Sequence, residues 1–505
     1  MAPTSTAVRS PARQQNTLRK LEEPIPLLLR PVLRAFILGY GSAVAPRVLT
    51  LVLQHVSRLR QRSKNAAAAK GRVDGVSCAP HEPFFVSLGR LLRGGLDPQR
   101  FPTFCAALVG GSTLFEVIIS KALSTWAQSI SPLARIRLSR WFATFTASWL
   151  SLTLLQSKPS QAFSATVVEH AEGATSPKEK TIRYAGRSLD LTLFAVTRAL
   201  DVIVGELWAR RKQRRLAAGK SWTAAESALS KLADPAMFAT SCAFIMWAWF
   251  YHPYKLRRAY YSWIKSAAAV DLRLIKALQR CRSGELRYGE DTGQAPLLQE
   301  MCRDYKWPLA WGDPAVAVPF PCEMVHMGRG PSCEYHALAR FLRSFKWAMA
   351  TYLPLNLILV ARSPGLASLR KSVKSAARSS AFLGAYIALF YYGVCLARTR
   401  LGPHVLGKDT AARQRIDSGI CVGTGCALCG WSILIEKPGR VANIGLFVAP
   451  RAMATLLPRR YPWDKQWRET AVFAASTAVV FTCVLENKAR VRGFLGTVLA
   501  TVLEP

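Results

Sequence analysis

Two long apolar segments are the strongest structural signal in this chain: residues 379–397, SSAFLGAYIALFYYGVCLA, and residues 418–435, SGICVGTGCALCGWSILI. Neither stretch contains a charged side chain. Each approaches the length of about 20 residues that an α-helix needs to cross the hydrocarbon core of a bilayer. The two stretches therefore predict membrane-spanning helices.

Apolar stretches of similar or shorter length recur along the rest of the chain. Several carry a single charge, and one of them ends in a cluster of Trp and Tyr, as at a membrane–water interface. They lie at residues 32–54, 102–120, 142–156, 191–208, 236–250, 347–360, 441–457 and 471–485. Together, the stretches predict an all-α fold, a polytopic membrane helical bundle with about eight to ten membrane helices.

The charge balance supports this class of protein. The 505 residues include 68 Lys and Arg against 30 Asp and Glu, a net charge of +38, yet half of the chain is hydrophobic. A disordered basic chain would lack the apolar residues, and 12 cysteines are too few for a disulfide-stapled secreted scaffold. A nucleic-acid-binding protein would gather its charge on one soluble face, so we predict no nucleic-acid partner.

Much of the excess charge falls in three runs without acidic residues, at 57–72, 209–220 and 369–378. Basic runs beside apolar spans mark the side of the membrane that is not translocated. They also suit contact with anionic lipid headgroups. We therefore predict that these runs are connections between spans, lying against a lipid bilayer.

Three ungapped matches, in the same order in both halves, indicate an internal duplication. The matched segments are residues 105–116 with 425–436, 187–199 with 440–452, and 236–257 with 471–492. Repeats of this kind are common in membrane carriers, although repeats alone do not show transport. We predict two homologous helical membrane units, at residues 95–280 and 405–505.

The remaining segments complete the predicted domain organisation. They are a disordered N-terminal tail at 1–25, a first apolar helix and basic loop at 26–94, an irregular Cys/His-containing connection at 281–340, and linking membrane helices at 341–404. The tail is basic and nearly free of acids, a composition that also fits a mitochondrial presequence.

Two glutamates and two arginines recur at equivalent places in the two predicted units. They are Glu116 and Glu436, and Arg198 and Arg451. An ionisable group at membrane depth costs roughly 2.5–3.5 kcal/mol on insertion scales, so it usually finds a partner. We predict intramembrane ion pairs of Glu116 with Arg198 and of Glu436 with Arg451. The alternative is that each glutamate lies at the membrane interface, where it needs no partner.

The densest chemical signal is the segment 321–336, PCEMVHMGRGPSCEYH. It carries Cys322, His326, Cys333 and His336, and two Cys with two His form a sufficient tetrahedral set for a structural zinc ion. The spacing is not that of a standard zinc finger. Two alternatives stay open: a disulfide between Cys322 and Cys333 in an oxidising compartment, or four ordinary loop residues.

At this cluster the sequence resembles a known family. Cys322, His326 and Cys333, followed by Arg340, Phe341 and the Tyr-Leu-Pro of residues 352–354, resemble the cysteine-rich segment of the transmembrane protein 135 family, most closely its fungal members. The pattern of residues 430–436, then Arg440, then Arg451 and Ala452, is similar to the membrane region of the same family. That region is similar in turn to the superfamily of the mitochondrial inner-membrane translocases and a small peroxisomal membrane protein.

The resemblance implies a multi-pass protein of the peroxisomal or mitochondrial membrane, linked to lipid metabolism, to movement of a solute or lipid, or to organelle dynamics. A homo-oligomer or an organelle membrane complex would fit this class. The alternative is a translocase-like subunit for protein import or pore formation. The chain has no HExxH, GxSxG, Walker A or GxGxxG motif in the required context, so we predict no enzymatic activity, no catalytic residue and no organic cofactor.

Overall fold

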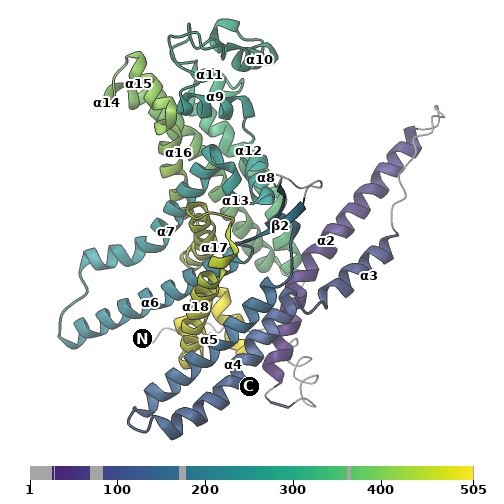
Figure 1. The fold of residues 1–505 in the computed structure, drawn as a ribbon. Coiled ribbons are helices and arrows are strands. Elements are labelled where there is room, and N and C mark those ends of the chain that lie inside the picture. Colours follow the sequence, from purple (N-terminus) through teal and green to yellow (C-terminus); the bar gives the residue numbers. More distant parts are fainter. Residues whose placement is uncertain (1–25, 28, 69–82, 170–177, 361–364, 504–505) are drawn as a thin grey trace. The chain divides into compact units, whose positions relative to one another are not determined.

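The computed structural model describes the 505-residue chain except for residues 1–25, 28, 69–82, 170–177, 361–364 and 504–505. The predicted disordered tail at 1–25 therefore lies outside the described residues, as does part of the basic run at 57–72. The described chain is almost entirely helical, which confirms the all-α prediction (Figure 1). It forms two compact units, residues 1–206 with 460–505 and residues 207–459.

The first unit is built on helices and a small sheet. Its helices are α2 (Arg30–Ala68), α3 (Phe84–Gly95), α4 (Phe101–Trp126), α5 (Pro132–Gln156), the first part of α6 (Leu189–Ala217), α18 (Gln466–Glu486) and α19 (Gly493–Leu503). The strands β1 (Ser164–Glu169), β2 (Lys178–Ala185) and β3 (Tyr461–Pro462) form an antiparallel sheet in that order. The sheet is a small exception to the predicted fold class.

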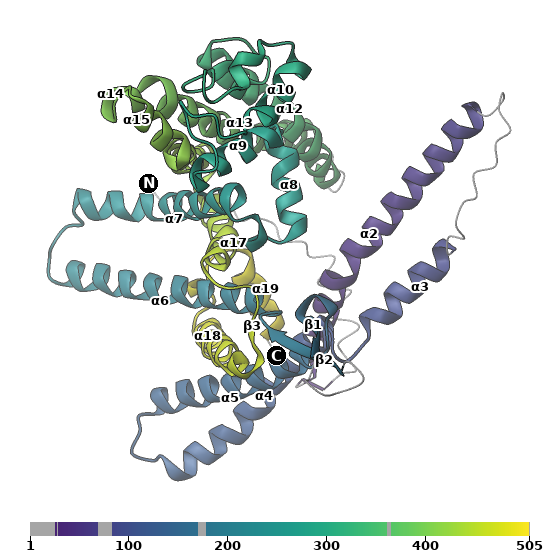
Figure 2. The same cartoon turned by 45° about the horizontal axis from the view of Figure 1, so that its top comes forward.

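Helix α5 is central to this first unit, because α4 lies along one side of it and α18 packs against it as well (Figure 2). The helix begins where Ser131 accepts a hydrogen bond from the amide of Ala134 and Pro132 occupies the first turn. Phe104 of α4, Leu152 of α5 and Phe473 of α18 meet in one buried apolar cluster. These contacts hold α4 and α5 together with α18, which follows them by more than 300 residues, in a single unit.

The second unit contains the two uncharged apolar segments at 379–397 and 418–435. Its helices are α7 (Ala224–Tyr251), α8 (Arg258–Ala268), α9 (Leu272–Ser283), α10 (Ala295–Tyr305), α11 (Cys322–His326), α12 (Cys333–Val360), α13 (Leu366–Cys395), α14 (Gly402–Val405), α15 (Thr410–Arg415), α16 (Cys421–Cys429) and α17 (Pro438–Leu456). Two π-helical turns, η5 (Leu396–Arg400) and η6 (Ile416–Ile420), extend α13 and lead into α16. A 3-10 turn, η7 (Gly430–Ile435), follows α16.

Small residues let the helices of the second unit approach closely. A Cβ added at Gly425 of α16 would lie 2.8 Å from the carbonyl oxygen of Phe390, and one at Gly430 would lie 2.4 Å from Cα of Ala239. Both positions therefore require glycine, and the close approach brings α16 and η7 against α13 and α7.

Five helical segments among the described residues are long and apolar enough to cross a membrane, fewer than the predicted eight to ten. They are Arg30–Arg60, Phe101–Trp126, Leu366–Val405, Thr410–Ile435 and Trp463–Glu486. The other predicted spans lie in α5, α6, α7, α12 and α17, whose lengths include more charged and polar residues. Exposed apolar side chains such as Leu49, Leu53 and Ile118 on α2 and α4 suit contact with lipid.

The prediction that the three basic runs are connections between helices is wrong, because the runs are themselves largely helical. The described part of the run at 57–72 extends α2, most of the run at 209–220 extends α6, and the run at 369–378 begins α13. Arg, Lys and Ala are strong helix formers, so these runs lengthen the helices that precede or follow them. The segment 281–340 is also more ordered than predicted, because Leu298 and Met301 of α10 pack with Phe320 and Met324 in a small core of their own.

Candidate metal centre

Four side chains of the second unit form one buried group that could hold a metal ion: Cys322, His326, Cys333 and Cys395. Cys322 and His326 stand four residues apart on one face of the short helix α11. Cys333 begins α12, and Cys395 ends α13. The four potential ligand atoms lie within 4.8 Å of one another.

The turn between α11 and α12 brings the first three residues together. Met327, Gly328 and Gly330 have positive φ angles of 52°, 78° and 85°, so the chain reverses direction directly after His326. The left-handed conformation suits the two glycines and costs energy at Met327. The turn returns Cys333 to a position from which its Sγ lies 3.8 Å from that of Cys322.

The distances within the group match those of a tetrahedral zinc site. Cys322 Sγ lies 3.8 Å from Cys395 Sγ, and His326 Nε2 lies 3.5 Å from both sulfurs. A tetrahedral zinc ion with Zn–S of about 2.3 Å and Zn–N of about 2.0–2.1 Å separates two sulfurs by about 3.8 Å and a sulfur from a nitrogen by about 3.5 Å. Four of the six distances among the ligand atoms therefore match zinc coordination, and the two that join Cys333 to Cys395 and to His326 do not exceed 4.8 Å.

The imidazole of His326 is oriented for ligation by its outer neighbour. Nδ1 lies 2.7 Å from the carbonyl oxygen of Gly330, and since a carbonyl can only accept, Nδ1 is the protonated nitrogen. The lone pair of Nε2 then points into the group of sulfurs. Metal-bound histidines usually donate their second N–H to such a partner.

Electrostatics also favour a thiolate in this group. Hydrogen bonds, first with Cys395 and then with His326, lower the pKa of the Cys322 thiol to about 4, against the effect of burial. Burial opposes charge on His326, but its hydrogen bond with Cys322 raises the pKa of the ring above its ordinary value. Burial raises the pKa of the Cys333 thiol. A thiolate is the form of cysteine that binds metal.

The predicted fourth ligand, His336, is corrected to Cys395. The His336 ring stacks on the His326 ring with centroids 4.5 Å apart, and neither of its nitrogens has a hydrogen-bond partner. Burial lowers the pKa of His336 to about 3, so the ring is neutral at physiological pH. Helical geometry explains the change, because His336 lies one turn along α12 beyond Cys333, whereas the end of α13 brings Cys395 beside Cys322.

The structure does not form the alternative disulfide. Cys322 and Cys333 are free thiols with sulfurs 3.8 Å apart, whereas a disulfide bond is about 2.05 Å long.

A buried ion pair next to the cluster was missed in the sequence. Arg398 donates to both carboxylate oxygens of Asp417, at 2.7 and 2.9 Å, and the side chains are only 2% and 1% exposed. The hydroxyl of Tyr288 donates to the same carboxylate at 2.6 Å. Arg398 lies in the π-helical turn η5 and Asp417 in the π-helical turn η6. Such turns change the direction in which a helix presents its side chains, and they are frequent at functional sites.

The ion pair also positions the metal-binding segment. Nη2 of Arg398, which donates to Asp417, also donates to the carbonyl oxygen of Phe320 at 3.0 Å. The guanidinium lies 4.3 Å from the centre of the Phe320 ring. Phe320 precedes Cys322 by two residues. In the sequence, the ion pair could have been suspected only because Arg398 directly follows one uncharged stretch and Asp417 directly precedes the other.

The structure does not bring the predicted intramembrane pairs together. Glu116 of α4 pairs instead with Arg140 of α5 at 3.0 Å. Arg198 of α6 is buried and donates to the carbonyl oxygen of Arg492 at 3.3 Å. The prediction paired Glu116 of α4 with Arg198 of α6 and overlooked α5, whose Arg140 is the nearer cation.

The second predicted pair is replaced in the same way. Glu436 accepts a hydrogen bond from Ser379 at 2.5 Å and lies 3.7 Å from Arg440, one helical turn away. Arg451 bonds the carbonyl oxygen of Phe447 in its own helix and stacks on the Phe447 ring at 3.8 Å. Glu436 lies before the start of α17 and Arg451 lies near its end, so the helix separates them.

Fold and site together define a helical protein of membrane character with a buried Cys3His group. No family model, curated protein or solved structure matches the chain.

Proposed function

We propose that this chain is a non-enzymatic, multi-pass protein of an organelle membrane, in which Cys322, His326, Cys333 and Cys395 bind a structural zinc ion. The observation that carries the proposal is the close grouping of three sulfurs and one imidazole, all within 4.8 Å of one another, beside long apolar helices. Four protein ligands leave no open position for a substrate, which fits a structural and not a catalytic ion.

The ion would join two neighbouring elements to a third that lies about 60 residues further along the sequence. It would fix α11 and the start of α12 to the end of α13, one of the five apolar helices. Metal binding of this kind contributes directly to folding, because the site does not exist in the unfolded chain. The small core around Phe320 would thereby be anchored to the membrane-type helices of the second unit.

The biological role that fits best is the movement or organisation of a lipid or solute in a peroxisomal or mitochondrial membrane. The resemblance of the Cys/His segment to the transmembrane protein 135 family supports this role. The translocase-like alternative is supported by the repeated residue patterns at 105–116 and 425–436. Exposed arginines of α6, such as Arg210 and Arg214, suit contact with anionic lipid headgroups.

Two measurements test the membrane assignment. Alkaline carbonate extraction of the source cells should leave the protein in the membrane pellet, and release into the supernatant would contradict the proposal. A fluorescent fusion imaged with peroxisomal and mitochondrial markers should coincide with one of the two organelles.

Reconstitution into liposomes separates the two functions. Lipid or solute exchange without ion conductance is expected for the leading proposal. Ion conductance or uptake of a precursor protein would favour the translocase-like alternative.

A further inference from the structure

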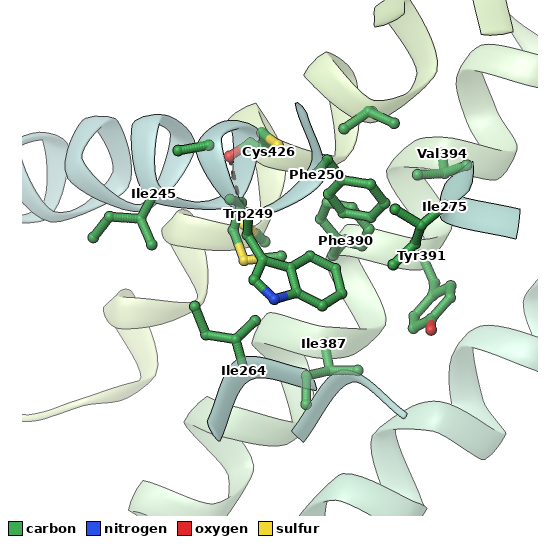
Figure 3. Close-up of a cluster of buried hydrophobic side chains, with 14 of the residues drawn as sticks. Ile245, Trp249, Phe250, Ile264, Ile275, Ile387, Phe390, Tyr391, Val394 and Cys426 are labelled. Carbon is green, nitrogen blue, oxygen red and sulfur yellow. Dashed lines mark hydrogen bonds between the residues drawn. The ribbon is translucent and has the colours of Figure 1, made fainter. Parts of the chain in front are cut away.

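The second unit contains an apolar cavity of about 310 Å³, walled by α7, α8, α13 and α17 with Tyr352 of α12. Its inner wall includes Ile245, Trp249, Ile264, Ile387 and Phe390, all nearly inaccessible to solvent. Figure 3 shows the indole of Trp249 facing the side chains of Ile264 and Ile387. The cavity is separate from the Cys3His group, whose four members do not line it.

Two of the polar groups in the wall have hydrogen-bond partners, and most of the remaining wall is hydrocarbon or aromatic carbon. The indole nitrogen of Trp249 donates to the carbonyl oxygen of Tyr261 at 3.4 Å, and the hydroxyl of Tyr391 donates to that of Ala268 at 3.2 Å. The interior therefore offers hydrocarbon and aromatic faces with little to hold water. Apolar cavities of this kind stay dry and accept apolar ligands.

The rim of the cavity is aromatic and carries one cation. Trp263 and Phe447 line the cavity and remain about half exposed. The guanidinium of Arg451 lies 3.8 Å from the centre of the Phe447 ring and 5.8 Å from that of Tyr260, another wall residue. Within the part of the chain that the structure describes, no carboxylate lies in salt-bridge range of Arg451.

We propose that this cavity binds one acyl chain that carries an anionic head, with the chain inside and the head at Arg451. A cavity of about 150 Å³ accepts benzene, so about 310 Å³ gives room for roughly a dozen carbon atoms. Arginine binds carboxylate and phosphate through paired hydrogen bonds, which suits the head of a fatty acid or of a phospholipid. The inference names a ligand class for the proposed lipid role and so rests on that proposal.

The chain-binding half is tested with 12-bromododecanoate on the purified full-length protein in non-ionic detergent. Bromine quenches a tryptophan that it touches, so the ligand should quench emission saturably. The Trp249→Phe variant should lose part of the quenching, and the cavity-filling variant Ala267→Phe should lose most of the binding. Equal quenching in Ala267→Phe and the unmodified protein, both shown to be folded by circular dichroism, would overturn the proposal.

Binding of the anionic head at Arg451 can be tested with a substitution at the rim of the cavity, without changing any residue of the buried core. Arg451→Gln should raise the Kd for 12-bromododecanoate about tenfold or more and leave the Kd for the uncharged 12-bromododecanol unchanged. Arg287→Gln, at an exposed arginine outside the cavity, is the matched control. Equal affinities for dodecanoate in the two variants would overturn the assignment of the head to Arg451.

The source of the chain is decided by native mass spectrometry of the protein as purified. A bound mass of a fatty acid or of a phospholipid identifies the source, and neither mass, together with no quenching, would overturn the inference. Failure of this inference differs from failure of the proposed function. A carbonate-resistant, zinc-containing protein that binds no dodecanoate refutes only the cavity ligand, and a dodecanoate-binding protein released by carbonate refutes only the membrane role.

Discussion

Two ion pairs, one in each compact unit, use the same groups in different surroundings. Arg398 and Asp417 of the second unit are almost inaccessible, and a tyrosine hydroxyl and a backbone carbonyl complete their hydrogen bonds. Glu116 and Arg140 of the first unit are 31% and 26% exposed and share one short contact between α4 and α5. The buried pair is one part of a fixed polar junction beside the Cys3His group, whereas the exposed pair only joins two helices.

The contrast shows where this fold depends on exact geometry. A buried charge without its partner is costly, so each member of the junction must be present for the others to be tolerated. A half-exposed charge can turn to solvent or to lipid headgroups when its partner is lost. The following changes should therefore have large effects at the junction and small effects at the α4–α5 pair.

The largest effect is expected from removing a metal ligand. Cys395→Ser should reduce zinc in the purified protein from about one ion per chain to near zero and lower the thermal unfolding temperature, because metal binding and folding are coupled. Zinc content by elemental mass spectrometry and unfolding by circular dichroism measure the two effects.

The matched control for that change is His336→Phe, which keeps an aromatic ring against His326 and removes no ligand of the Cys3His set. It should retain zinc. Loss of zinc in His336→Phe with retention in Cys395→Ser would restore the set of Cys322, His326, Cys333 and His336.

The next effect is expected at the buried ion pair. Asp417→Asn leaves Arg398 as an uncompensated buried charge and should lower the free energy of unfolding by about 3–5 kcal/mol. Chemical denaturation in detergent micelles measures the change.

Two variants make that measurement specific. Tyr288→Phe removes one hydrogen bond to Asp417 and should cost about 1 kcal/mol. The apolar double variant Arg398→Met with Asp417→Leu should recover most of the loss. A double variant that is less stable than Asp417→Asn would show that the hydrogen bond of Arg398 to Phe320 is the dominant contribution.

The fold could be predicted where the signal is local. The uncharged stretch at 379–397 lies mainly in α13, and the stretch at 418–435 lies in η6, α16 and η7. Hydropathy marked these helices but misjudged their ends, because the basic residues at 369–378 continue the same helix. Strand β3 was missed because it contains only Tyr461 and Pro462, too short a segment to carry a pattern. Strands β1 and β2, of six and eight residues, were missed because they lie within the segment 95–280 that was predicted to be a helical membrane unit.

Of the candidate site, only the ligands that lie close together in the sequence could be predicted. Cys322, His326 and Cys333 are close in sequence, and a turn with Gly328 and Gly330 lies between them. Cys395 reaches them only through the packing of α12 on α13, which no spacing rule contains. A cysteine at the end of an apolar helix looks like an ordinary packing residue until that contact is known.

A smaller effect is expected from acid acting on His336. Burial lowers its folded-state pKa to about 3, so between about pH 6.5 and 3 the unfolded chain binds a proton that the folded chain does not. Stability from this group is therefore present above pH 6.5 and is lost as the pH falls towards 3. His336→Phe should flatten this part of the stability profile, measured by denaturation across the pH range in metal-free buffer. An unchanged slope would mean that His336 is not buried as a neutral ring.

The smallest effect is expected at the exposed pair. Glu116→Gln should change the free energy of unfolding by about 1 kcal/mol or less, because the exposed fraction of both side chains leaves them access to other partners. Arg140→Gln should behave in the same way. A loss as large as that of Asp417→Asn would contradict this expectation and carry a specific meaning. The exposed faces of Glu116 and Arg140 would then meet hydrocarbon and not water, which would place this part of α4, one of the five apolar helices, inside the bilayer core.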